Sequence, residues 1–283
     1  MKTLFCTDGS KISYNAILNY SKWINSTNID VLNVFDLRHL PDFIAIENNV
    51  CNSIYNNTSE QILSYSEEFF EENNLNLGKK IKMCGSTIDN ILDIMENYDF
   101  IVLGSNGKKG IQKWLGSVSQ EISAISKIPV FISKSKNNAK KLLLAIDYSK
   151  YSTNAISDCL DKLNLREKEI YIATVYELPD YLFLDGNIDH KWIKDVEKKQ
   201  EKESAILLNN AENLFKKNNL QIKDKFILKG NPAKELINLS QKLDIDLIIT
   251  GSNKKKNLAS LLSNSVSLRI LNNSKSDILI FKY

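Results

Sequence analysis

Short apolar runs alternate along the chain with segments whose apolar residues recur every three or four positions. In residues 1–136 the runs expected to be strands are 2–7, 30–37, 79–84, Phe100–Leu103 and Pro129–Ile132. The segments with helical spacing are Ser13–Ile24, Ser59–Glu72, Ile88–Met95 and about Val118 to Ser126, whereas residues 38–57 show no clean period and are expected to be a loop or short helices. Strands that alternate with helices form parallel sheets covered on both faces, so the pattern predicts an α/β fold.

The same order of segments returns after a polar, basic stretch at residues 133–141, which is the expected linker. Five segments of the second half match segments of the first in the same order; Asp147 matches Asp8 and Gly251 matches Gly104. Self-similarity of this kind indicates a tandem duplication. The expected domains are residues 1–136 and 140–283.

Glycine and serine cluster where the fourth strand of the first half ends and the next helix begins. Gly104, Gly107 and Gly116 lack a Cβ, so the backbone can approach a ligand there and adopt positive φ. Ser117 can cap the helix and donate its hydroxyl to a phosphate oxygen, and the unpaired N–H groups of a helix start favour an anion. An ordinary strand–loop–helix connection also uses glycine, but a position at the carboxyl end of a buried strand favours a phosphate site.

This stretch resembles the nucleotide-binding signature of the universal stress protein family. It reads Gly104-Ser105-Asn106-Gly107, then eight residues, then Gly116-Ser117-Val118-Ser119. The family's pattern is Gly, two residues, Gly, nine residues, Gly and then Ser or Thr, so the second gap is one residue shorter here. The resemblance covers nearly the whole chain, twice. It implies two tandem flavodoxin-like (adenine nucleotide alpha hydrolase-like) domains, each a five-stranded parallel sheet of order 3-2-1-4-5 with helices on both faces.

The resemblance also implies which residues hold the nucleotide, expected to be ATP or AMP with or without Mg²⁺. Asp8 and its neighbours would line the adenine and ribose pocket, and Val34 would pack on adenine. The full expected set is Cys6, Thr7, Asp8, Val34, Leu103, Gly104, Asn106, Gly107, Gly116, Ser117, Val118 and Ser119. From the residues alone, Asp8 also suits a turn that starts a helix, and Val34 and Leu103 also suit the core.

The second half departs from the signature. Lys254 stands where Gly107 stands, and Asn264 replaces Gly116, so side chains occupy positions where phosphates would lie. The lysines at 254–256 could attract an anion, but a solvated basic loop is the preferred interpretation. We expect this half to bind nucleotide weakly or not at all. By the same resemblance, we expect it to pack on the first half as a pseudo-dimer through the fifth strands.

Composition and charge bear on which classes of partner and which cellular compartment to expect. The chain has 283 residues and a formal net charge of +3, which gives no argument for nucleic acid or an anionic membrane as the main partner. No apolar run approaches the ~20 residues of a membrane span, and the first ten residues contain no signal-peptide core. The four cysteines show no paired metal spacing, which together with the absence of an export signal indicates the cytoplasm.

The function expected from the sequence is that of an ATP- or AMP-binding regulatory protein of the stress response, with no residue assigned to catalysis. A slow ATP hydrolase is one alternative, although Asp8 is the one acidic residue placed near the pocket and no Walker motif is present. A nucleotide-free protein-interaction module is the other, favoured by the short gap and the altered second half. Protein partners and a homodimer of the whole chain stay open.

Overall fold

The computed structural model describes the chain except residues 25–27, 37–47, 106–115, 135–137, 179–189 and 254–264. The elements of the first half are β1 (Lys2–Cys6), α1 (Lys11–Trp23), β2 (Asn28–Phe35), α3 (Asn48–Glu72), β3 (Leu77–Cys84), α4 (Thr87–Ile94), the 3₁₀ helix η2 (Met95–Asn97), β4 (Phe100–Gly104), α5 (Ser117–Ile125) and β5 (Val130–Ser133). Those of the second half are β6 (Lys141–Ala145), α6 (Lys150–Lys162), β7 (Glu169–Tyr176), α7 (His190–Lys217), β8 (Ile222–Lys229), α8 (Pro232–Leu243), β9 (Leu247–Ser252), α9 (Val266–Asn273) and β10 (Asp277–Lys282).

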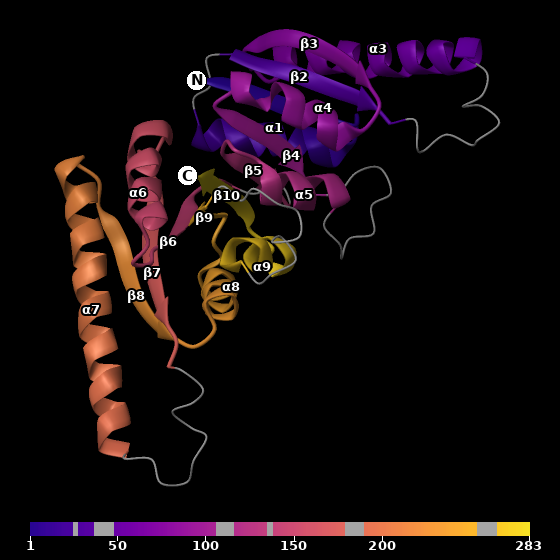
Figure 1. Ribbon diagram of the computed structural model, residues 1–283. Helices are drawn as coiled ribbons and strands as arrows, with labels where there is room; N and C mark the ends of the chain where they lie inside the picture. The colour runs from indigo at the N-terminus through magenta and orange to yellow at the C-terminus, as the bar shows by residue number, and fades with distance from the viewer. Residues whose placement is uncertain (25–27, 37–47, 106–115, 135–137, 179–189, 254–264) are drawn as a thin grey trace.

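Within the described residues, ten strands form one continuous sheet in the order β3-β2-β1-β4-β5-β10-β9-β6-β7-β8. Each half therefore has the strand order 3-2-1-4-5, and its strands pair in parallel, as predicted. The pairing of β5 with β10 is antiparallel and joins the halves. Figure 1 shows the two lobes meeting at these strands. The expected pseudo-dimer through the fifth strands is confirmed.

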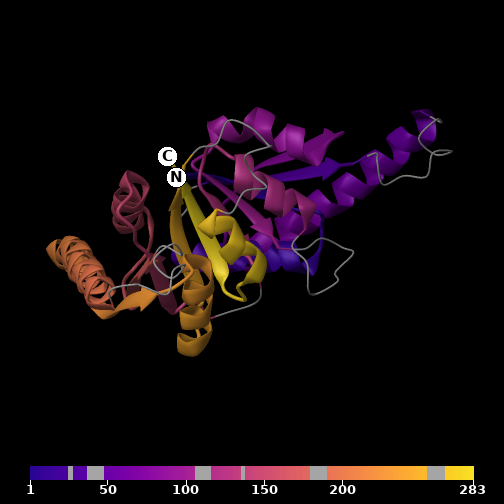
Figure 2. The same cartoon turned by 60° about the horizontal axis from the view of Figure 1, so that its bottom comes forward.

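Helices cover both faces of this sheet (Figures 1 and 2). One face carries α1, α3, α6 and α7, whose apolar side chains share a core that includes Phe5, Ile17 and Phe215. The other carries α4, α5, α8 and α9 over a second core that includes Ile101 and Ile248. Both cores run through both halves, which explains why the central strands are apolar on both sides. No helix in the described ranges combines the length and apolar character that a bilayer crossing needs.

Two helices differ from the sequence expectation. α3 begins at Asn48, well before Ser59, so the expectation of a loop or short helices up to residue 57 is wrong for its last ten positions. Figures 1 and 2 show the first turns of α3 reaching past the strands, where a helix needs no apolar stripe. In α7, the apolar residues that the sequence offers as possible anchors are Trp192, Val196, Ile206 and Leu207. Val196 and Leu207 are partly buried, but Trp192 and Ile206 are about half exposed. The buried side of α7 instead carries Leu208, Ala211 and Phe215.

Candidate functional site

The carboxyl ends of β1, β2 and β4 meet at one edge of the first-half sheet. β1 pairs with β2, with Cys6 opposite Leu32, and with β4, with Phe5 opposite Val102. The turn after β1, the end of β2 and Gly104 at the end of β4 therefore lie at the same edge. This satisfies the condition for the first strand and the glycine loop to converge.

Asp8 shapes the turn after β1. Its Oδ1 accepts a hydrogen bond from the Ser10 backbone N–H at 3.0 Å, and the Ser10 side chain in turn caps α1 by accepting from Ser13 N. The second half repeats this turn, because Asp147 Oδ1 accepts from Ser149 N at 2.9 Å. The turn role proposed for Asp8 is therefore present in both halves. Asp8 is only half-buried, so its carboxylate also remains accessible at the edge.

Cys6 and Thr7 lie beneath this turn and are both buried. Burial raises the pKa of the Cys6 thiol well above its usual value, so this thiol stays neutral. The Thr7 hydroxyl hydrogen-bonds the Ser13 hydroxyl at 2.7 Å and accepts from Gly9 N at 3.0 Å. Gly9 itself adopts φ +80°, which a glycine tolerates without strain. These side chains support the turn from below.

Gly104 is explained by helix packing. A Cβ added there would lie 3.1 Å from the Cα and N of Ser13 in α1, closer than a well-packed side chain tolerates. Gly251 in the second half faces Tyr151 of α6 in the same way, with even less room. Glycine at this position therefore lets the first helix of each half lie against the fourth strand, whether or not a ligand is present.

The start of α5 lies at the same edge, and its N-cap residue has no side chain. Its N-cap residue is Gly116, with φ −62°, and Ser117 is the first helical residue. The expectation that Ser117 caps the helix is therefore wrong, and Gly116 does not use the positive φ that glycine allows. The gap before the helix is one residue shorter than in the second half, where Ser265 is the N-cap of α9 and accepts from Leu268 N. The helix begins one residue earlier relative to the serine, so glycine takes the cap position.

Two hydrogen bonds fix the first turn of α5 onto the end of β4. The Ser119 hydroxyl donates to the Gly104 carbonyl at 2.6 Å, and Gly116 N donates to the Ser105 carbonyl at 2.6 Å. Ser119 is consequently buried, whereas Ser117 is exposed. Ser105, which sequence reasoning did not select, is also buried, and its own N–H bonds to the Ser133 carbonyl. Position next to Gly104 was the only signal for it.

The remaining expected residues fall into two groups. Val34 and Val118 are half-buried and pack against the core on the α4 and α5 face, and Leu103 is buried in that core. Asn106 and Gly107 lie outside the described residues, as do Lys254 and Asn264 of the second half. Among the described residues, no group of three His, Cys, Asp or Glu side chains is placed to hold a metal.

A separate hollow of about 330 Å³ lies in the second half. It is lined by Ser240, Gln241, Asp244, Ile245, Asp246, Lys275 and Ser276, at the amino ends of β9 and β10. None of the expected nucleotide-binding residues is among them. It is therefore distinct from the candidate site.

Known proteins share both the sequence pattern and the fold. The family model described as "Universal stress protein family" matches residues 138–282, just over half of the chain. A universal stress protein of Methanocaldococcus jannaschii is 24% identical over 151 residues, which are 53% of this chain and 86% of that protein. The matched model covers the half with the altered glycine loop, so the match does not depend on an intact signature.

Solved structures extend the likeness to both halves. A universal stress protein from Archaeoglobus fulgidus has a TM-score of 0.70 and 21% identity, covering 99% of this chain and 96% of that chain. A putative universal stress protein from Pseudomonas aeruginosa has a TM-score of 0.64 and 12% identity, covering 99% and 92%. At these identities the likeness concerns the fold, which in each case spans the two-lobed arrangement. The family model matches just over half of this chain, and the fold of these structures covers nearly all of it. The chain therefore belongs to the universal stress protein family.

Proposed function

We propose that the chain is a regulatory protein that binds one adenine nucleotide, ATP or AMP with or without Mg²⁺, at the carboxyl-end edge of its first half. In this proposal residues 1–136 form the binding domain. Residues 140–283 form a second domain that binds nucleotide weakly or not at all and supports the first. Both act in the cytoplasm.

The observation that carries the proposal is the open first turn of α5. The first intrahelical bond runs from Gln120 N to the Gly116 carbonyl, so the N–H groups of residues 117–119 precede it and have no intrahelical acceptor. The N-cap residue, Gly116, has no side chain to cap them. Backbone N–H groups at a helix start, aided by the helix dipole, are suited to phosphate oxygens. In α9 the Ser265 hydroxyl already takes one of the equivalent donors, which favours the first half.

The base and ribose would lie beside this turn, over the ends of β1 and β2. The half-buried Asp8 carboxylate can accept from ribose hydroxyls, and the half-buried Val34 offers an apolar contact to adenine. Cys6, Thr7 and Leu103 would act as the buried floor beneath them. Occupancy would regulate by stabilising one arrangement of this edge, which other proteins can detect.

Replacement of Gly116 by Asp tests the proposal. An Asp side chain at the N-cap would accept from the first-turn N–H groups and add a negative charge where the phosphates are to lie. We expect calorimetric titration of ATP, with Mg²⁺, to show one site per chain in the wild type. In Gly116→Asp the affinity should fall by at least about tenfold, since charge-assisted hydrogen bonds to phosphate are lost. The thermal midpoint should stay equal or rise, because the helix gains a cap.

Ser265→Asp is the matched control, because it places the same side chain at the N-cap of α9, which is already capped. It should leave ATP affinity unchanged. If Ser265→Asp weakens binding and Gly116→Asp does not, the second half holds the nucleotide. If the wild type binds no nucleotide at millimolar concentration, the proposal fails and the nucleotide-free interaction module is preferred. Phosphate release above background that is lost in Asp8→Ala would instead support the slow hydrolase.

A further inference from the structure

The junction between the halves is built around a local two-fold relation. β5 and β10 pair in antiparallel fashion with Phe131 opposite Leu279, Ile132 opposite Ile278 and Val130 opposite Ile280. The sequence match places Phe131 on Leu279, so this pair lies where the two-fold relation maps each strand onto the other. Any contact at the junction is therefore either repeated on the other side or specific to one side.

One pair of contacts is repeated. The Lys134 ammonium, after β5, donates to the Leu271 carbonyl of α9, and the Lys282 ammonium at the end of β10 donates to the Ser123 carbonyl of α5. The two lysines are 148 positions apart (282 − 134), and so are the two carbonyls (271 − 123). Because both halves carry both parts, these contacts would form between any two halves and do not select a partner.

Asp277, the first residue of β10, makes contacts that are not repeated. Its side chain is fully buried. Oδ1 accepts from the Ser133 hydroxyl at 3.0 Å and from Lys134 N at 2.7 Å, while Oδ2 accepts from the Asn19 amide at 3.0 Å. All three donors belong to the first half. A buried carboxylate is tolerated only with such partners, since its desolvation is otherwise costly.

The second half cannot supply these side chains to a copy of itself. By the sequence match, the position of Asn19 is occupied there by Asp158 and that of Ser133 by Phe281. If β10 paired with β10 of another copy, each Asp277 would face an aromatic ring in place of a hydroxyl and a carboxylate in place of an amide. The first half has Pro129 at the position of Asp277 and carries no such charge.

We propose that Asp277 makes the β10 edge selective for a first half, whether of its own chain or of another copy, and excludes pairing between two second halves. Asn19 and Ser133 are the residues by which the first half is recognised. Selection arises because the wrong partner deprives the buried carboxylate of its hydroxyl and amide donors and sets a like charge beside it. Recognition therefore depends on one carboxylate of β10 and two side-chain donors of the first half.

Asn19→Asp in the full-length chain tests this, because it gives the first half the residue that a second half would present. Hydrogen exchange of the β5 and β10 amides measures opening of the junction, with amides of β2 and β7 as an internal reference. Asn19→Ala, which removes a donor without adding charge, should speed exchange about tenfold. Asn19→Asp should speed it at least about a hundredfold, because a second carboxylate then faces Asp277. Asn19→Asp should exchange faster than Asn19→Ala whether the junction opens locally or only with global unfolding, so the comparison of the two rates tests the proposal in either case.

Two further variants complete the test. Asn19→Asp combined with Asp277→Asn restores one carboxylate and one amide and should return exchange to within about tenfold of the wild type. Asp158→Asn makes the reverse replacement at the matched position, where the side chain accepts from the Tyr283 hydroxyl, and an Asn oxygen can keep that bond. It should change the rate less than about threefold. Equal rates for Asn19→Asp and Asn19→Ala, or no recovery in the double variant, would overturn the proposal.

Discussion

Gly251→Ala is expected to lower the free energy of unfolding by about 3 kcal/mol or more. The added Cβ would lie 2.8 Å from the Tyr151 carbonyl carbon and closer still to its oxygen. These are backbone atoms in the first turn of α6, which cannot rotate away as a side chain can. The helix must therefore shift off β9, and apolar contacts beneath it are lost. Urea denaturation followed by circular dichroism measures the loss.

Gly104→Ala is the matched control at the equivalent place in the first half. There the nearest atoms, Ile12 Cγ2 and the Cα and N of Ser13, lie 3.1 Å from the added Cβ. A displacement of a few tenths of an ångström relieves this, so about 1 kcal/mol is expected. Equal losses of unfolding free energy in Gly251→Ala and Gly104→Ala would contradict the inference that the helix packs more tightly on Gly251. If Gly104→Ala keeps full ATP affinity, glycine at this signature position serves the helix and not the phosphates.

The fold was predictable because its signals are local or repeated. Runs such as Phe100–Leu103 are apolar at consecutive positions, as a strand covered on both faces requires. The duplication shows the same order of segments a second time, which supports the assignment of each one. The start of α3 could not be predicted, because the helix continues where no apolar stripe is needed. The start of α5 depends on a gap one residue shorter, and sequence alone does not say whether a loop or a helix absorbs that difference.

The candidate site was predictable in outline, since Asp8, Val34 and Gly104 all follow or end buried parallel strands. The sequence did not predict that these residues also have structural roles. Gly104 allows α1 to pack closely on β4, and Asp8 accepts a hydrogen bond within its own turn. The junction shows the same limit. Asp277 receives its donors from residues 144 and 258 positions away, so no local pattern marks it as a partner-selecting residue.

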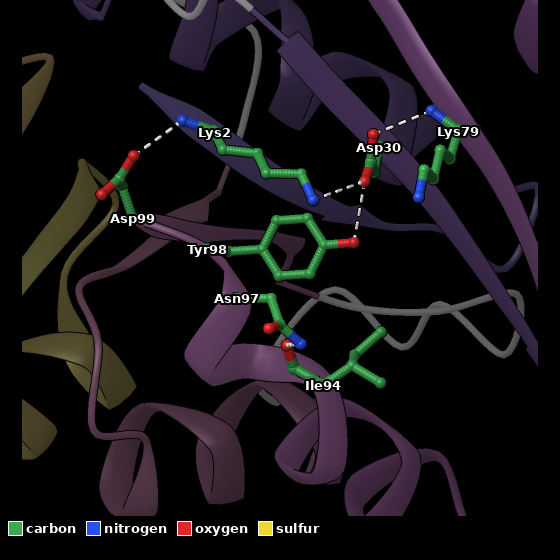
Figure 3. Close-up of polar contacts among 7 residues, drawn as sticks. All are labelled: Lys2, Asp30, Lys79, Ile94, Asn97, Tyr98 and Asp99. Carbon is green, nitrogen blue, oxygen red and sulfur yellow. Dashed lines mark hydrogen bonds and ion pairs between the residues drawn. The ribbon is translucent and has the colours of Figure 1, made fainter.

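Asp30→Ala is expected to lower the free energy of unfolding by about 2–3 kcal/mol. Figure 3 shows the Tyr98 hydroxyl and the Lys2 ammonium both directed at Asp30 Oδ2, at 2.9 and 3.3 Å, while Oδ1 accepts from Lys79 N at 2.8 Å. The Asp30 side chain is fully buried. Its removal leaves the buried Tyr98 hydroxyl without its acceptor, which costs more than the net worth of that bond, and removes the acceptor of the more exposed Lys2 and Lys79 donors as well. A Cβ at Gly78 would overlap both Asn28 Oδ1 and Asp30 Oδ1.

The same cluster predicts a dependence of stability on pH. Burial acts to raise the pKa of Asp30, but the donors from Lys79, Tyr98 and Lys2 outweigh it and hold the pKa below its usual value. Since the folded pKa is the lower one, the stabilisation is complete above the unfolded value of 3.8 and is lost as the pH falls through the folded value. Wild-type stability should thus fall more steeply than that of Asp30→Ala below about pH 4.

Tyr98→Phe separates the contribution of the Tyr98–Asp30 hydrogen bond from that of the Tyr98 ring packing. It removes one donor to Asp30 but keeps the ring over which the Lys2 ammonium lies, 4.5 Å from the centroid. We expect a loss of about 1 kcal/mol at neutral pH, as for a single hydrogen bond whose acceptor keeps other partners. With one donor gone, the folded pKa of Asp30 should rise toward its usual value, so the acid loss begins at higher pH. Urea midpoints between pH 2 and pH 7 measure both effects. Parallel acid profiles for the wild type and Asp30→Ala would show that this carboxylate is not the group whose protonation destabilises the first half.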